Sequence, residues 1–325
     1  MPIQPGSTDQ RPLRPFQQQP FARLPELPRC PHPYFDADAH DIELDSASLG
    51  PLRVHYREYG AGEPLLLVHG LMTSSYSWRY VLDGLGAHYR LIMPDLPGNG
   101  RSAPPAHRFS ATDLGAWIGE FQAAVGIRGC RVVGNSLGGY LVMRQAVADP
   151  GAFAKVVNLH GPAFAQARLY ALHAALSVPG AQDVFGWWIR RDTQRWAHQI
   201  VHYYDDTLKS REEAGEYGAP LQTVAGTRAF ASYLRDVMDP RDHADFASAL
   251  AQRAAQGRSF PVPLQLIYSR QDPLVSPTIG ARLAELIPDA QLRWVERSSH
   301  FVQVDSPVEV VALILGFLGT AETAK

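Results

Sequence analysis

The chain has 325 residues, of which 46% are hydrophobic and 19% are charged. Its formal net charge of −2 gives no electrostatic reason to expect nucleic acid or an anionic membrane as a partner, so no nucleic-acid partner is predicted. The two cysteines, Cys30 and Cys130, are too few for a disulfide framework, and a reducing cytoplasm is the expected location. No apolar run approaches the roughly 18 residues of a spanning helix, so no membrane span is predicted.

The first 34 residues are rich in proline, glutamine and arginine and contain few apolar residues. Such a segment buries too little apolar surface to offset the entropy that it loses on ordering. We therefore predict a flexible tail over residues 1–34, with no apolar stretch that would indicate a secretory signal. The alternative is an arm that packs on the body of the protein through Phe16, Phe21 and Leu24.

Two short strands open the folded part of the chain. The apolar patterns at residues 42–44 and 52–59 flank Leu49-Gly50-Pro51, which is typical of a hairpin turn. Further short apolar runs predict six more strands, at residues 64–68, 91–93, 131–133, 156–159, 264–268 and 292–295. Helical patterns lie between most of them, at residues 111–125, 137–148, 278–286 and 307–318. Strand alternating with helix predicts an α/β fold, with a mostly parallel central sheet and helices on both faces.

One segment breaks this alternation. Between residues 162 and 257 the pattern is helical, contains no convincing strand and is rich in aromatic residues. We predict that residues 162–257 form a helical cap inserted after the sixth strand of the sheet. The α/β core then comprises residues 41–161 and 258–319. Some of the aromatic cap residues would wall a substrate pocket between cap and sheet.

A candidate nucleophile lies in Gly134-Asn135-Ser136-Leu137-Gly138, which matches the pattern G-x-S-x-G directly after a predicted strand and directly before a predicted helix. In this context the chain reverses sharply, so that the serine hydroxyl is exposed above the edge of the sheet. Gly134 and Gly138 lack Cβ atoms, which lets strand and helix approach each other. The free N–H groups of the helix N-terminus favour developing negative charge. Ser136 is therefore the candidate nucleophile.

A serine hydroxyl needs an adjacent base to act as a nucleophile at neutral pH. His300 is the candidate base, because it follows the last predicted strand and precedes the last predicted helix, at the same edge of the sheet as Ser136. Asp272, just past the preceding strand, is the candidate acid that orients the base. An ordinary surface histidine and a turn-forming Asp-Pro pair are the alternatives.

Backbone N–H groups would hold the negative charge that develops on the substrate oxygen. One is expected from Leu137, the residue after the nucleophile. The other is expected from the loop after the third strand, where we assign it to Leu71. His69 is expected to help hold that loop and is given no chemical role.

With these landmarks the sequence resembles the α/β-hydrolase superfamily over roughly residues 41–319. The order Ser136, Asp272, His300 is the chain order of that superfamily's catalytic triad. Further landmarks are matched by His-Gly at residues 69–70 and by DLPGNGRS at residues 95–102. The resemblance implies the α/β-hydrolase fold and serine hydrolase chemistry.

Within the superfamily, residues 73–79 and the run HFVQ at residues 300–303 resemble the haloalkane dehalogenase and epoxide hydrolase branch. Those families carry an aspartate nucleophile where this chain has Ser136. The dehalogenases also bind halide through an asparagine and a tryptophan, at the positions where this chain has Leu71 and Leu137. These differences at the catalytic positions argue against dehalogenase or epoxide hydrolase chemistry more strongly than the matching residues argue for it.

A partial resemblance to another branch rests on Asn135 beside the nucleophile. It is similar to hydrolases that cleave carbon–carbon bonds in aromatic ring-fission products. Those enzymes usually carry tryptophan after the catalytic histidine, where this chain has Phe301.

Two other patterns are given no function. His198 and His202 are four residues apart on a predicted helix, but a zinc protease would need glutamate where Gln199 stands, so no metal site is predicted. The tripeptide GNG at residues 98–100 is interpreted as a turn rather than a nucleotide-binding loop, since Ala103 stands at the position of the third glycine.

The expected reaction is hydrolysis of a carboxylic ester of a small apolar molecule through an acyl-enzyme on Ser136, with no cofactor and no metal. The alternative is hydrolysis of a carbon–carbon bond in a ring-fission product. A third possibility, of another class, is a ligand receptor that keeps the triad, as karrikin and strigolactone receptors do. The sequence predicts neither the natural substrate nor the oligomeric state.

Overall fold

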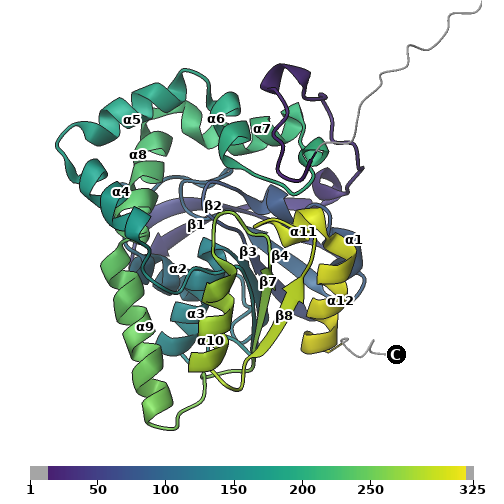
Figure 1. The fold of residues 1–325 in the computed structure, drawn as a ribbon, viewed down its shortest axis with the longest axis vertical. Helices are drawn as coiled ribbons and strands as arrows, with labels where there is room; N and C mark the ends of the chain where they lie inside the picture. Colours follow the sequence, from purple (N-terminus) through teal and green to yellow (C-terminus); the bar gives the residue numbers. More distant parts are fainter. Residues whose placement is uncertain (1–13, 320–325) are drawn as a thin grey trace, which may run out of the picture.

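A single sheet of eight strands runs through residues 14–319, the part of the chain that the computed structural model describes (Figure 1). The strands are β1 (Asp38–Ser46), β2 (Gly50–Tyr59), β3 (Pro64–Val68), β4 (Arg90–Pro94), β5 (Arg131–Asn135), β6 (Lys155–Leu159), β7 (Leu264–Ser269) and β8 (Gln291–Val295). Their order across the sheet is β1-β2-β4-β3-β5-β6-β7-β8. β2 pairs antiparallel with β1 and β4, and all other neighbours are parallel. The eight predicted strands and the mostly parallel sheet are confirmed.

The sheet is buried on both faces, because alternate residues of its strands pack into two separate hydrophobic cores. In β3, Leu66 and Val68 face one core, whereas Leu65 and Leu67 face the other. All four residues are at most 1% exposed. This two-sided burial is the reason that the central strands are unbroken apolar runs in the sequence rather than alternating patterns.

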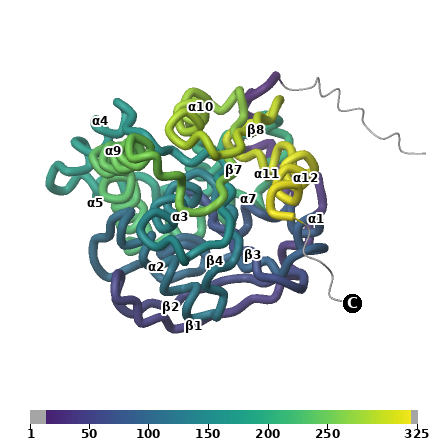
Figure 2. The backbone as a smooth tube through the Cα atoms, turned by 90° about the horizontal axis from the view of Figure 1, so that it is seen from below, coloured from purple at the N-terminus to yellow at the C-terminus, as the bar shows by residue number. Residues whose placement is uncertain are grey.

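Helices cover both faces of the sheet (Figures 1 and 2). α1 (Leu82–Gly86) and α12 (Pro307–Leu318) lie on one face, and α2 (Ala111–Ala124), α3 (Leu137–Ala148) and α10 (Pro277–Leu286) lie on the other. The four helices predicted from the sequence begin and end within one residue of these bounds. Four short turns of helix are η1 (Phe21–Arg23), η2 (Tyr34–Asp36), η3 (Ser75–Trp78) and α11 (Val302–Asp305). None of the helices within residues 14–319 is both long and apolar enough to cross a membrane.

A group of helices, which we call the cap, stands over the carboxyl ends of the central strands (Figure 1). It follows β6 and consists of α4 (Ala167–Ser177), α5 (Ala181–Arg190), α6 (Thr193–Ile200), η4 (Asp206–Leu208), α7 (Arg211–Gly218), η5 (Ala219–Gln222), α8 (Val224–Ser232) and the π-helical turn η6 (Tyr233–Val237). Residues 162–238 are all described and contain no strand.

The last helix of the predicted cap belongs instead to the core. α9 (Pro240–Ala255) lies beside α3 on one face of the sheet (Figure 1). The His243 ring of α9 stacks on Tyr140 of α3, with 4.3 Å between ring centroids, and Phe246 joins the core on that face. The cap predicted for residues 162–257 is therefore corrected to end near residue 238. The physical reason is that α9 packs against both α3 and α10, where Phe246 and Leu250 are buried, and its own sequence does not reveal these partners.

Residues 14–34, which were predicted to be part of a flexible tail, form the alternative packed arm, which contacts the cap and, through Tyr34 and Ser75, also the core. The Phe16 N–H donates a hydrogen bond to the Tyr204 carbonyl oxygen (3.0 Å), and Leu24 is 6% exposed. The tail prediction is corrected for these residues, because the cap supplies contacts that the composition of the arm does not reveal. The first 13 residues of the predicted tail lie outside the described residues.

The packing of the arm can be tested with two leucines. We expect Leu24→Ala to lower the free energy of unfolding by about 2–3 kcal/mol, because truncating a buried leucine removes contacts and leaves a cavity. Leu27→Ala is the matched control, since Leu27 is 67% exposed, and it should change stability by less than about 0.5 kcal/mol. Urea unfolding followed by circular dichroism measures both. Equal effects of the two substitutions would contradict a packed arm.

Candidate active site

Ser136 occupies a sharp turn between β5 and α3. Its backbone has φ 53° and ψ −120°, a conformation that residues other than glycine rarely adopt. The turn also needs close backbone approach, since a Cβ at Gly138 would lie 2.2 Å from the Val68 carbonyl oxygen and a Cβ at Gly70 would lie 3.0 Å from Ser136 Cβ. Glycine at both positions makes room for the strained serine. The geometry is that of the sharp turn predicted between the strand and the helix.

His300 and Asp272 lie on neighbouring loops at the same edge of the sheet and contact each other. Nδ1 of His300 lies 2.6 Å from Oδ2 of Asp272, and both side chains are buried. Oδ1 of Asp272 accepts hydrogen bonds from the N–H groups of Leu274 (2.7 Å) and Val275 (2.9 Å). Burial alone would raise the pKa of Asp272, but the facing histidines and their hydrogen bonds outweigh burial and hold that pKa below its ordinary value. Asp272 is therefore an anion, fixed in place, at neutral pH.

Ser136 and His300 line one cavity of about 450 Å³ between the sheet edge and the cap. No hydrogen bond joins their two side chains within residues 14–319, and such bonds are often long before substrate binds. The wall is mostly apolar and includes Leu71, Met72, Leu137, Leu274, Val275 and Phe301 from the core, and Leu169, Leu172, Phe185, Trp196, Ile200, Val201, Phe230, Leu234 and Met238 from the cap region. Among the wall residues, Arg168 alone carries a fixed charge, and its guanidinium donates to the Leu274 carbonyl oxygen.

The two leucines expected to supply oxyanion N–H groups both line this cavity beside Ser136. Leu137 is the first residue of α3, so its N–H group has no partner within the helix. Leu71 lies on the loop after β3, which His69 holds. Nδ1 of His69 lies 2.8 Å from the Gly70 carbonyl oxygen, and Nε2 accepts the Leu96 N–H (2.8 Å). Burial lowers the pKa of His69, which suits a neutral, structural ring.

Asn135 links the serine turn to the histidine loop. Its Nδ2 donates to the backbone carbonyl oxygens of His300 (3.3 Å) and Leu159 (3.4 Å), and the residue is fully buried. The side chain thus helps to fix the backbone that carries His300, which is a positional role that the sequence pattern did not identify.

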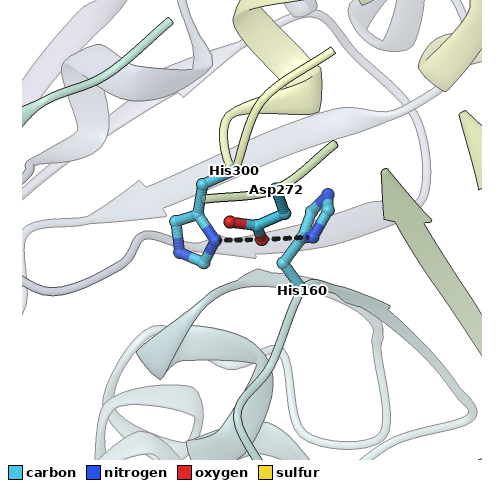
Figure 3. A group of neighbouring side chains, drawn as sticks. All are labelled: His160, Asp272 and His300. Carbon is cyan, nitrogen blue, oxygen red and sulfur yellow. Dashed lines mark hydrogen bonds and ion pairs between the residues drawn. The ribbon is translucent and has the colours of Figure 1, made fainter. Parts of the chain in front are cut away.

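A second histidine, His160, contacts Asp272 and was missed in the sequence (Figure 3). It comes directly after β6, and its Nδ1 lies 2.7 Å from the same Asp272 oxygen that His300 contacts. The signal that could have found it is the one used for Asp272, namely a polar residue directly after a central parallel strand. The sheet edge brings such residues together.

His198 and His202, the pair considered for metal, lie beside a buried ammonium group. Lys209 Nζ lies 2.7 Å from Asp206 Oδ1 and 2.9 Å from the His198 carbonyl oxygen. Nε2 of His198 lies 2.8 Å from the Gln19 carbonyl oxygen, so this ring contacts the arm. Burial and the charge of Lys209 lower the pKa of both histidines. The ammonium group of Lys209 thus neutralises Asp206, which is the role that a metal ion would have at this position.

The fold and this site define a hydrolase of α/β architecture, and comparison with known proteins supports that class. The sequence model of the alpha/beta hydrolase fold matches residues 63–307. The chain belongs to the alpha/beta hydrolase fold family.

Relatives with different reactions resemble the chain at low identity. It is similar to the 2-hydroxy-6-oxononadienedioate/2-hydroxy-6-oxononatrienedioate hydrolase of Cupriavidus pinatubonensis, with 24% identity over 82% of this chain and 91% of that protein. It is also similar to the pimeloyl (acyl-carrier protein) methyl ester esterase of Aeromonas salmonicida, with 27% identity over 82% of this chain and 100% of that protein. Among solved structures, the haloalkane dehalogenase DatA from Agrobacterium tumefaciens aligns with a TM-score of 0.69 and 20% identity, over 89% of this chain and 99% of that one. The two sequence relatives support a hydrolase, and the solved structure supports the fold.

Proposed function

We propose that this protein hydrolyses carboxylic esters of small apolar molecules, with Ser136 as nucleophile, His300 as base and Asp272 as the acid that orients the base. The observation that carries the proposal is the apolar cavity that Ser136 and His300 share. An apolar acyl or alcohol group that binds in this cavity is removed from water, and this favours binding by about 25 cal/mol per Å² of buried apolar surface. The reacting carbonyl group would then lie beside the serine.

The proposed reaction has two stages. Ser136 Oγ attacks the ester carbonyl carbon while Nε2 of His300 takes the hydroxyl proton. Asp272 keeps the other proton of His300 on Nδ1 and stabilises the imidazolium that forms. The N–H groups of Leu71 and Leu137 stabilise the oxyanion. His300 passes its proton to the leaving alcohol, and water activated by the same histidine then releases the acid.

Carbon–carbon bond hydrolysis is the second candidate function, and Arg168 is the observation that favours it. Its guanidinium is the one fixed charge on the cavity wall and suits a carboxylate. The Cupriavidus pinatubonensis relative is named for a dienedioate substrate, which carries carboxylates. An ester chain-length series and one ring-fission product, assayed with the wild type and Arg168→Ala, separate the two. If the ring-fission product turns over faster and Arg168→Ala loses only that activity, the second candidate replaces the first.

Steady turnover also distinguishes an enzyme from a ligand receptor that keeps the triad. Release of p-nitrophenol from p-nitrophenyl butyrate should exceed the protein concentration many times over. A single turnover followed by retained product would point to the receptor instead.

We expect no dehalogenase activity, despite the similarity to a haloalkane dehalogenase. Attack by Ser136 on an alkyl carbon would leave an ether, which has no carbonyl group for water to attack. A departing halide would also meet the side chains of Leu71 and Leu137, and a poorly solvated anion in an apolar cavity costs several kcal/mol. Wild-type protein that hydrolyses p-nitrophenyl butyrate should therefore release no bromide from 1-bromobutane, as measured by ion chromatography. Multiple-turnover bromide release that disappears in Ser136→Ala would contradict the ester proposal.

A further inference from the structure

Two histidines converge on a single carboxylate oxygen (Figure 3). Oδ2 of Asp272 lies 2.6 Å from Nδ1 of His300 and 2.7 Å from Nδ1 of His160. His160 itself is fully buried. Among the described residues, Nδ1 of His160 makes no hydrogen bond of regular geometry, and its 2.7 Å contact with Oδ2 of Asp272 is a short polar contact.

The tautomer of His160 follows from its other ring nitrogen. Nε2 of His160 accepts a hydrogen bond from the Ser269 N–H at 3.0 Å, and a nitrogen that accepts a hydrogen bond carries no proton. The proton of the neutral ring is therefore on Nδ1, directed at Asp272. Burial lowers the pKa of His160, and the facing carboxylate only partly offsets this, so the ring stays neutral at pH 7.

The backbone of His160 is strained to reach this position. Its φ is 56°, in the left-handed region that residues other than glycine and asparagine seldom occupy. Such strain persists only where the surroundings compensate for it, and it is concentrated at functional sites. The neighbouring Tyr268 supports the turn, because its hydroxyl donates to the Gly161 carbonyl oxygen at 2.7 Å.

The same three side chains have the composition of a metal site, since their ligand-type atoms lie within 4.8 Å of one another. Their hydrogen bonds favour a different interpretation. A metal ion would need unprotonated Nδ1 atoms, whereas the Ser269 N–H occupies Nε2 of His160 and keeps the proton on Nδ1. The cluster is therefore two histidines that face one carboxylate oxygen, His300 through a hydrogen bond and His160 through a 2.7 Å contact.

We propose that His160 is a positioning residue for this site: its Nδ1–H faces the Asp272 oxygen that His300 also contacts, and this sets the orientation of His300 and how strongly Asp272 stabilises its protonated ring. The inference rests on the proposed roles of Ser136, Asp272 and His300. With both donors present, the negative charge of Asp272 is shared between two rings, which limits how strongly it stabilises the imidazolium form of His300. The carboxylate also keeps its place, because Leu274 and Val275 hold the other oxygen.

Loss of the His160 donor should therefore let Asp272 stabilise the protonated ring of His300 more strongly, which would move the acidic limb of the pH–rate profile to higher pH. The titratable groups around His300 are Asp272 and His160, with Tyr268 beside His160 and Asp305 bound to the Ser299 N–H (2.8 Å). Asp305 is itself half-buried, and this burial raises its pKa to about 6. Asp305 titrates in the wild type and in the variants alike. A difference between their pH–rate profiles therefore reports on the cluster of Asp272, His160 and His300.

The test compares His160→Phe, which keeps a ring without a donor, with His160→Asn, which keeps an N–H donor near Nδ1 and tolerates positive φ. The readout is the rate at which a fluorophosphonate labels Ser136. In this reaction Oγ bonds to phosphorus, fluoride leaves and His300 takes the proton, so no natural substrate is needed. In His160→Phe we expect the acidic limb of the pH–rate profile to move up by about 0.5–1 pH unit and the plateau rate to fall about 10-fold. His160→Asn should restore the limb to within about 0.3 unit of the wild type.

A purely structural role for His160 would lower the melting temperature of His160→Phe and leave the acidic limb in place, which would overturn the inference. Should His160→Phe fail to fold, ¹⁵N NMR of histidine-labelled wild-type protein gives the same decision. His160 should show the Nδ1–H tautomer throughout the pH range of the acidic limb, and an Nε2–H tautomer would overturn the inference. Failure of the proposed function is distinguishable, because Ser136→Ala would then be labelled as fast as the wild type.

Discussion

Ser136→Ala is expected to lower the turnover of p-nitrophenyl butyrate by at least about 10³-fold, because alanine lacks the oxygen that forms the acyl-enzyme. His300→Ala and Asp272→Asn should each lose a comparable factor. The first removes the base, and the second replaces the carboxylate that holds the Nδ1 proton of His300. Since the three side chains act as one unit, double variants should lose little more than the worst single variant. Values of kcat/KM for all variants measure this.

Ser177→Ala is the matched control for these variants. Ser177 is an exposed serine of α4, and its substitution should leave turnover unchanged. Near-wild-type turnover in Ser136→Ala would overturn the proposed function. Near-wild-type turnover in Asp272→Asn alone would instead assign the orienting role to another carboxylate and keep the serine mechanism.

The second large effect is expected at a buried ion pair that joins the cap to the core. Nη2 of Arg79, which follows η3 in the core, lies 2.5 Å from Oε2 of Glu213 on α7, and the side chains are 0% and 4% exposed. The Tyr203 hydroxyl donates to the same oxygen at 2.6 Å. Burial raises the pKa of Glu213 even though Arg79 faces it. The buried carboxylate of Glu213 therefore depends on the positive charge of Arg79 for its stability.

We expect Arg79→Met to lower the free energy of unfolding by about 3–5 kcal/mol, because Glu213 is left buried without a counter-charge. The double variant Arg79→Met/Glu213→Leu should recover most of this loss, since neither charge remains in the interior. Urea unfolding of the two variants and the wild type measures both effects.

An exposed ion pair supplies the control. Arg228 and Asp183 lie 3.2 Å apart and their side chains are both 64% exposed, so Arg228→Met should cost less than about 1 kcal/mol. A loss in Arg79→Met as small as that of the control would contradict the role of the buried pair in holding the cap.

The sequence by itself determined the secondary structure and topology class of the core, because these depend on local patterns. Central strands such as β3 are unbroken apolar runs since both faces of the sheet are buried. α3 begins directly after the strained turn at Ser136, and α12 has Pro307 in its first turn, so both helix starts are encoded by their own residues.

The sequence also placed the candidate site at one edge of the sheet. Ser136, Asp272 and His300 each follow a parallel strand, and the carboxyl ends of parallel strands meet at the same edge. The tertiary structure added the 2.6 Å contact between Asp272 and His300 and the cavity that Ser136 shares with His300. The chemical roles of the three residues stay predictions until the variants are measured.

Three features were decided only by the tertiary structure. The arm at residues 14–34 gains its contacts from the cap and the core, and α9 joins the core because it packs against α3 and α10. His160 carries a sequence signal, since it directly follows β6, but its contact with Asp272 at 2.7 Å is made only in the folded chain. Local composition and periodicity report the preferences of a segment. Each of these features depends instead on which distant group the packed chain places within contact distance, and a single segment carries no record of that partner.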